Sequence, residues 1–233
     1  VATGWGGRSA DMVVNCNNGS GFPTVTTISG ASSFCVGAGQ LPLAIDTGAL
    51  DQVLVLNGFY GSPDDVARKN SMDYARQIDY AATLIAAAND TTQQAVNIGA
   101  ALSVDPALAT VFPASYLGDQ LQQVAKVMKL NLTSPLLSLN RQIFYVEQGG
   151  YDTHQDQLTD QANQFVELSQ AMNAFYAATQ ELGISDRVVT FTLSDFGRTL
   201  EPSGDNGSVG SDHGWGSHHF VMGGAVAGGN FYG

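Results

Sequence analysis

Residues 142–146 (QIFYV) and residues 187–193 (RVVTFTL) are two β-prone runs, and an amphipathic pattern at helical spacing covers Gln157–Leu182 between them. Near-continuous runs of Val, Phe and Tyr are typical of strands buried on both faces of a parallel sheet. Two parallel strands need a long crossover connection, usually a helix. The stretch therefore predicts a parallel βαβ unit and an α/β fold.

Outside this unit the sequence predicts two more helices and several short strands. SPDD at residues 62–65 is a helix start, because Ser62 can cap, Pro63 suits the first turn and acidic residues complement the helix dipole. We expect this helix to run to about Ala88 and a second to cover Asp119–Lys129. The strand candidates are Leu41–Ile45, Gln52–Leu56 and His219–Met222, and residues 1–40 are rich in loops.

Length and charge limit the class of protein. A chain of 233 residues can bury its core as a single α/β domain over residues 1–233, or as at most two small domains. Nine Lys and Arg against 21 acidic residues give a formal net charge of −12, which disfavours nucleic acid and anionic membrane surfaces as partners. No apolar run approaches the roughly 18 residues of a membrane span. An anionic substrate remains possible because a bound metal ion reverses the local potential.

Cys16 and Cys35 are the only cysteines, and both lie in a segment rich in Gly, Ser, Thr and Asn. We expect a disulfide between them, since stapling a loose segment is typical of secreted proteins. The alternative is two unrelated buried thiols. The few lysines and many small polar residues also favour a periplasmic or extracellular protein.

Histidines and aspartates cluster in glycine-rich segments. Asp152 and His154 lie two residues apart, so in extended chain both side chains point to the same side and can reach one ion. Asp212 and His213 are adjacent and point apart, which suits two neighbouring ions. Imidazole and carboxylate together are typical ligands of divalent metals. The alternative for each pair is a capped turn or a polar surface loop.

Three further residues belong to the predicted site. Asp195, like Asp152 and His154, follows a predicted strand, and ligands collect at the carboxyl ends of such strands. At least one of His218 and His219 is a candidate ligand, and strand alternation favours His219. Arg198 can clamp an oxyanion bidentately, or instead form a salt bridge to a nearby acid.

These motifs occur in a recognisable order: GGYDTH at 149–154, a long helix, SDFGRT at 194–199, SDHGW at 211–215 and VMGG at 221–224, with GWGGR at 4–8 near the start. The series resembles the bacterial domain-of-unknown-function family 1501, secreted sulfatase-like proteins of the alkaline phosphatase superfamily. The resemblance implies a three-layer α/β/α sandwich with a mostly parallel sheet, export from the cytoplasm, and a site for one or two divalent ions.

The resemblance also implies roles for individual residues. Asp212 and His213 match the Asp-His pair that follows a strand in superfamily hydrolases, and Asp152 and His154 match an earlier Asp and His at the first metal. Asp195 stands where many members carry another Asp-His pair, but Phe196 replaces the histidine. The segment that bears the nucleophile in active members is expected upstream of this chain, so the chain resembles an internal fragment.

Together these observations predict a secreted, metal-dependent hydrolase of phosphate or sulfate esters. Its substrate would be an anionic small molecule or a polysaccharide ester. The predicted metal ligands, for Zn, Mg, Mn or Ca, are Asp152, His154, Asp195, Asp212, His213 and His219. Arg198 is expected to stabilise transition-state charge. The alternatives are a non-catalytic extracytoplasmic binding or structural protein of the same fold, and a purely structural single-metal site.

Overall fold

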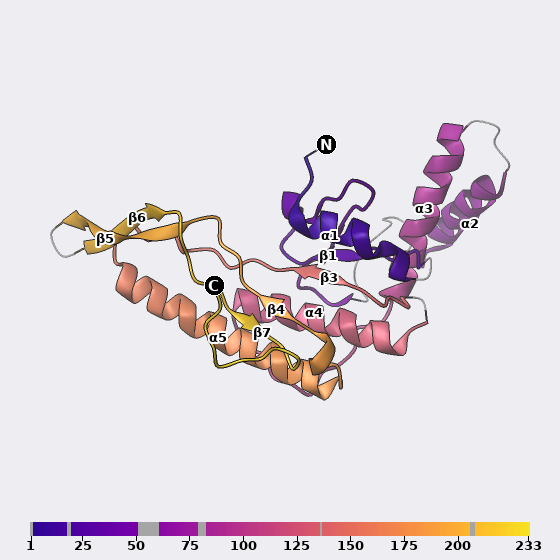
Figure 1. Ribbon diagram of the computed structural model, residues 1–233. Coiled ribbons are helices and arrows are strands. Elements are labelled where there is room, and N and C mark those ends of the chain that lie inside the picture. The colour runs from indigo at the N-terminus through magenta and orange to yellow at the C-terminus, as the bar shows by residue number, and fades with distance from the viewer. Residues whose placement is uncertain (1, 18–19, 51–60, 79–82, 136, 206–207) are drawn as a thin grey trace. The chain divides into compact units, whose positions relative to one another are not determined.

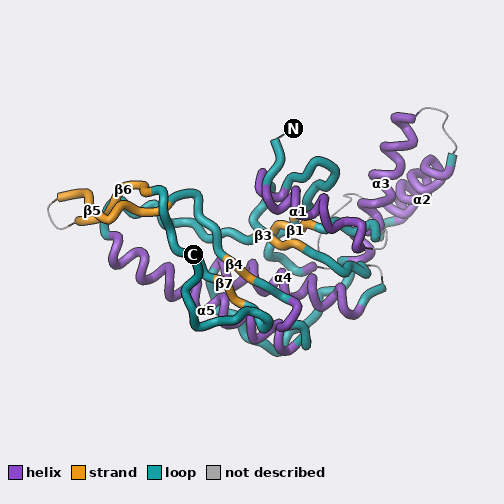
Figure 2. Tube along the Cα trace, in the orientation of Figure 1, coloured by secondary structure: helices purple, strands orange, loops and turns teal. Residues whose placement is uncertain are grey.

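The computed structural model describes residues 2–17, 20–50, 61–78, 83–135, 137–205 and 208–233. It is a mixed α/β structure, with most of its helices and strands labelled in Figure 1 and coloured by type in Figure 2. Its described residues form five α-helices and a three-stranded parallel sheet. The chain divides into two compact units, one made of Val1–Pro106 and Lys126–Tyr145, the other of Ala107–Ala125 and Val146–Gly233. The single α/β domain expected from the length stays a prediction.

The first unit is built around a small parallel sheet of strand order β2-β1-β3. Strand β1 (Val25–Thr27) is central and fully buried, with β2 (Leu43–Ala44) on one side and β3 (Ile143–Tyr145) on the other. Helix α1 (Trp5–Val13) and two short 3₁₀ helices, η1 (Val14–Asn17) and η2 (Ser33–Cys35), precede or follow β1. The core of this part consists of Ala10, Val25 and Cys35, with Phe34, Ile143 and Tyr145 packed against it.

Asn17 ties the N-terminal segment to the chain that enters β3. Its buried side-chain amide donates to Thr24 Oγ1 and to the Arg141 carbonyl, each at 3.0 Å. The side-chain oxygen Oδ1 of Asn17 accepts from the backbone N–H groups of Asn140 at 3.0 Å and Arg141 at 2.8 Å. Since buried polar groups must be paired, these four bonds hold β1 and β3 in register.

The structure does not support the predicted disulfide. Cys16 and Cys35 are free thiols, the first exposed and the second buried. Burial raises the pKa of the Cys35 thiol to about 11, so this side chain acts as a small apolar core residue.

The predicted helix from Ser62 to Ala88 is two helices. Its start is confirmed, because Ser62 and Asp65 form a reciprocal capping box at the beginning of α2 (Pro63–Gln77). Ile78 is extended (φ −74°, ψ 127°), which ends α2, and α3 covers Thr83–Ala101. The helix end was wrong because apolar residues at helical spacing continue through both helices. The predicted strand Gln52–Leu56 lies outside the described residues.

Helix α4 (Tyr116–Thr133) contains the predicted helix Asp119–Lys129 and extends beyond it at both ends. Its buried face includes Leu121, Val124 and Val127. Buried Gln120 forms a reciprocal pair with Glu147, donating to its carbonyl at 2.7 Å and accepting from its N–H at 2.9 Å. This pair anchors the chain just before the Asp152 loop. None of the described helices is long and apolar enough to cross a membrane.

The second unit contains α5 (Gln157–Glu181), the short helix η4 (Ser185–Arg187) and two antiparallel strand pairs. Strand β4 (Thr190–Phe191) pairs with β7 (Val221–Met222), in the region of the strand predicted at His219–Met222. Strands β5 (Gly197–Asp205) and β6 (Ser208–Gly214) form a hairpin that the sequence did not predict as strands.

The two strands of the predicted parallel βαβ unit have other partners in the structure. Helix α5 forms as expected, but β3 pairs with β1, whereas β4 pairs antiparallel with β7. An apolar run predicts a strand and does not specify its partner, because pairing depends on contacts with distant segments. Only two of the seven residues predicted in the second strand enter a ladder, and Phe191 is 56% exposed.

Replacing Asn17 with alanine should destabilise the first unit. The change removes all four hydrogen bonds of the buried Asn17 side chain, three of them with the backbone of Asn140 and Arg141, so we expect the free energy of unfolding to fall by about 3 kcal/mol. Urea denaturation followed by circular dichroism measures the change. Asn15→Ala, an exposed asparagine of the same 3₁₀ helix, is the control and should change stability by no more than about 0.5 kcal/mol. Equal midpoints for the two variants would contradict the role of Asn17.

Candidate metal centre

The loop that carries Asp152 and His154 is held against the first turns of α5. Gln161 donates from Nε2 to Thr153 Oγ1 at 3.3 Å, and the Gln164 amide donates to the Gly150 carbonyl. Gly150 has φ +90°, a backbone conformation that glycine adopts without strain. Thr153 is buried, and Asp152 and His154 on either side of it are exposed. The alternation expected from their spacing is therefore present.

The β5–β6 hairpin brings Asp212 and His213 to this loop. Strand β6 lies so close to the Thr153–His154 backbone that a Cβ atom on Gly210 would stand 2.2 Å from the His154 carbonyl carbon. The Ser211 N–H donates to the Thr153 carbonyl at 3.4 Å. A glycine at position 210 is therefore a condition for the two segments to meet.

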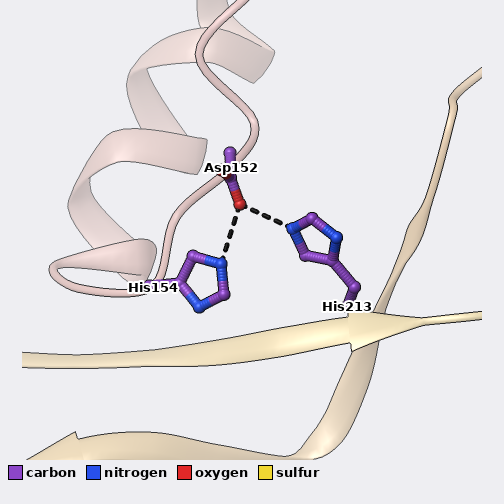
Figure 3. Close-up of side chains that lie close together, drawn as sticks. All are labelled: Asp152, His154 and His213. Carbon is purple, nitrogen blue, oxygen red and sulfur yellow. Dashed lines mark hydrogen bonds and ion pairs between the residues drawn. The ribbon is translucent and has the colours of Figure 1, made fainter.

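Three nitrogen atoms converge on one carboxylate oxygen, Asp152 Oδ1. His213 Nε2 lies at 2.7 Å, His154 Nε2 at 2.9 Å and Arg198 Nη1 at 3.3 Å (Figure 3 shows the two histidines). The ligand atoms of Asp152, His154 and His213 all lie within 4.8 Å of one another. Ligands about 2.1 Å from a common ion stand about 3.0–3.4 Å apart, so this cluster needs little movement to hold one ion.

Asp212 contacts the same cluster from its far side. Its Oδ1 lies 3.0 Å from His154 Nδ1, so the imidazole of His154 spans the two carboxylates of Asp152 and Asp212. Metal-binding histidines almost always present their second ring nitrogen to a carboxylate or carbonyl, which fixes the tautomer and the ring orientation. Asp212 occupies the place of that orienting carboxylate.

His213 is supported by an aromatic neighbour. Its ring stacks on Phe196 with centroids 4.0 Å apart and an interplanar angle of 1°. The Arg198 guanidinium lies 5.6 Å from the centroid of the Phe196 ring. Phe196 stands where the resemblance leads one to expect a histidine, and here it packs against the His213 imidazole.

Arg198 forms the salt bridge that was the alternative to an oxyanion clamp. Besides Asp152, it contacts Ser211 twice, with Nε donating to Oγ at 3.2 Å and Nη2 to the carbonyl. Ser211 Oγ in turn donates to Gln157 Oε1 at 2.6 Å. Sequence reasoning missed this role of Gln157 and Ser211, since neither position carries a local signal that links it to Arg198.

Two predicted ligands do not join the cluster. Asp195 and His219 are both exposed, and neither belongs to the group formed by Asp152, His154 and His213. Asp195 lies in the segment between β4 and β5, before Gly197, where the pairing of β5 with β6 begins. His218 is likewise exposed.

The cluster is open to solvent, and the pKa of its carboxylate is lowered. The side chains of Asp152, His154 and His213 are 62%, 47% and 48% exposed, so an ion could enter without a large opening. The hydrogen bond from His213, the electrostatic attraction of the two histidines and the hydrogen bond from Arg198 hold the pKa of the Asp152 carboxyl below its ordinary value. Asp152 is therefore ionised at neutral pH, as a metal ligand must be.

A cavity of about 550 Å³ adjoins the cluster. Asp152, His154 and Asp212 form one part of its lining. The remainder comes from the Asp152 loop, the first turn of α5 and β5. A small molecule in this cavity would lie beside the histidines.

Replacing Gly210 with alanine should separate the hairpin from the Asp152 loop. The added Cβ meets backbone, which cannot move aside as a flexible side chain does, so we expect Asp212 and His213 to leave the cluster. The imidazole NMR signals of His154 and His213 should then shift toward those of free histidine. Gly149→Ala is the control, because a Cβ there meets nothing within 4 Å, and its histidine signals should be unchanged. Unchanged signals in both variants would disprove the close approach.

Comparison with known proteins identifies the family of this chain and no more. No curated protein and no solved structure matches it. Residues 64–233 match the model of a family described as "Protein of unknown function (DUF1501)". This match covers the Asp152 loop, α5 and the β5–β6 hairpin, and thus every residue of the cluster. The chain belongs to the DUF1501 family.

Proposed function

We propose that Asp152, His154 and His213 bind a divalent metal ion, with Asp212 orienting His154. The observation that supports this most directly is the convergence of two imidazole nitrogens on a single carboxylate oxygen, at 2.7 and 2.9 Å. The three residues come from two segments about 60 positions apart in the sequence, so their convergence results from the fold and not from local spacing. Two imidazoles with one carboxylate form the ligand set of several catalytic zinc sites, in which a further position stays open.

We further propose that the protein is an extracytoplasmic hydrolase of phosphate or sulfate esters. A divalent ion at this site would polarise an ester oxygen and lower the pKa of water near it. The motifs that resemble those of sulfatase-like proteins motivate this activity, and the exposed cluster beside a cavity gives an ester access. The three-layer α/β/α sandwich of the alkaline phosphatase superfamily and the periplasmic or extracellular location belong to the same proposal.

Each residue of the proposed site has a distinct role. Asp152, His154 and His213 supply ligands, and the carboxylate of Asp212 keeps the His154 ring turned so that Nε2 faces Asp152. Arg198 directs its positive charge at Asp152 Oδ1, which lies 3.3 Å from Nη1. Its contacts with Ser211 fix the guanidinium, so it also positions Asp152. Phe196 fixes the plane of the His213 ring.

A second candidate is a non-catalytic extracytoplasmic protein whose ion serves binding or structure. The observation that favours it is that Asp195 and His219 lie outside the cluster, which leaves fewer ligands than the two-ion set of superfamily hydrolases. The two proposals share the metal site and differ in turnover.

Removing a ligand should abolish tight metal binding. Loss of an outer partner of a ligand typically costs about 10- to 100-fold in affinity, so Asp212→Asn should weaken Zn²⁺ binding within that range. His213→Ala and Asp152→Ala remove direct ligands and should exceed about 100-fold. Isothermal titration calorimetry with Zn²⁺ and Mn²⁺ measures these changes.

The control is His218→Ala, an exposed histidine outside the cluster, which should bind both ions as the unaltered chain does. All variants should also carry Cys16→Ser, because an exposed thiol binds Zn²⁺ by itself. Equal affinity of the His213→Ala and His218→Ala variants would refute the site.

Turnover separates the two candidate functions. We expect the metal-loaded protein to hydrolyse 4-nitrophenyl phosphate or 4-nitrophenyl sulfate, and His213→Ala to reduce kcat/KM in proportion to the lost metal occupancy, because the reaction depends on the ion. The absorbance of the released 4-nitrophenolate measures the rate. A protein that binds the ion but turns over neither ester would be the non-catalytic alternative.

A further inference from the structure

The residues that line the cavity beside the metal cluster are mainly polar or charged. Beyond Asp152, His154 and Asp212, the lining consists of Gly150, Thr153, Gln155, Asp160, Ser203 and Gly204. None of these described lining residues has an aliphatic, aromatic or cationic side chain. Pockets for drug-like or aromatic ligands are instead lined mainly by apolar and aromatic groups. The composition of this cavity therefore selects against an apolar ligand.

The side chains of Asp160 and Gln155 line the cavity and can bind hydroxyl groups. Asp160 lies in the first turn of α5, and Gln155 lies in the loop just before the helix; both are exposed and line the cavity. A carboxylate accepts up to two hydroxyl hydrogen bonds on each oxygen, and an amide both donates and accepts. This combination suits a ligand with several neighbouring hydroxyl groups.

Ser203 adds a hydroxyl group without a hydrogen-bond partner among the described residues. This serine belongs to β5 and lines the cavity, and its hydroxyl oxygen is shielded from solvent. Leaving a buried hydroxyl unpaired is unfavourable. Because a serine side chain turns about a single bond, this hydroxyl can meet a ligand that enters the cavity.

The charge of the lining restricts the ligand further. Asp152, Asp160 and Asp212 contribute three carboxylates, and the guanidinium of Arg198 is held by Asp152 and Ser211 outside the lining. Two of the carboxylates belong to the metal cluster, whereas Asp160 is not among its ligands. Away from the ion, a second anionic group on the substrate would be repelled by Asp160.

We propose that the alcohol part of the ester is an uncharged polyhydroxylated group, such as a sugar, bound in this cavity through Gln155, Asp160 and Ser203. The inference rests on the proposed function, since the ion at the cluster would hold the anionic group of the same ester. The substrate class is then a singly esterified neutral polyol, and aryl esters serve only as generic probes.

The test compares two esters of the same type and similar size on the metal-loaded full chain. Glucose 6-phosphate carries ring hydroxyls, and cyclohexylmethyl phosphate has an apolar ring in their place; the corresponding sulfates form a second pair. We expect kcat/KM to be at least about tenfold higher for the sugar ester, because a site built for hydroxyl groups discriminates strongly against a ligand that lacks them. Asp160→Asn should lower kcat/KM roughly tenfold for the sugar ester and less than about twofold for the apolar one.

Asp156→Asn is the matched control. It removes a carboxylate from the residue before α5, does not line the cavity, and places asparagine at a left-handed backbone position (φ 49°) that asparagine tolerates. Its kcat/KM should equal that of the unaltered chain for both esters.

The results distinguish failure of the polyol inference from failure of the proposed hydrolase activity. Equal kcat/KM for the two esters, or an equal loss for both on Asp160→Asn, would overturn the polyol inference while ester hydrolysis stands. Turnover of none of the four esters and of neither 4-nitrophenyl ester would overturn the proposed hydrolase, and the polyol inference with it.

Discussion

Close packing of strand β6 on the Thr153–His154 backbone is the constraint on which the candidate site depends. At Gly210 there is no room for a side chain, since even a Cβ atom would stand 2.2 Å from backbone. This approach places the residues after Gly210 beside the loop that carries Asp152. Asp212 and His213 then reach His154 and Asp152 at hydrogen-bond distances. Contact between two backbones thus brings the side chains of Asp152, His154 and His213 together.

Around the cluster, neighbouring groups restrict each ligand from a different side. The ring of His213 lies flat on Phe196, His154 is turned by Asp212, and Asp152 is held by Arg198. Arg198 is itself fixed by Ser211, whose hydroxyl donates to Gln157 at the start of α5. For the proposed metal site, ligands that are already oriented lose less conformational freedom on binding, which favours affinity. The cavity next to these residues is lined in part by Asp152, His154 and Asp212.

The local parts of this description could be predicted from the sequence. Helix α5, the Ser62 cap and the projection of Asp152 and His154 to one side all depend on residues a few positions apart, where backbone geometry relates spacing to direction. Strand partners could not be predicted this way. β3 pairs with β1, more than 110 residues earlier, and β4 pairs with β7. Asn17 binds the chain that enters β3, a contact with no signal in the strand sequence itself. No property of the two apolar runs specifies those partners.

By itself, the sequence determined which residues have ligand chemistry and which local directions they take. Only the tertiary structure decided that Asp152, His154 and His213 meet, that Asp212 orients a ligand, and that Asp195 and His219 stay outside the cluster. The physical reason is that these outcomes depend on the register of the β5–β6 hairpin and on its distance from the Asp152 loop. Both are set by backbone packing between segments that are distant in sequence.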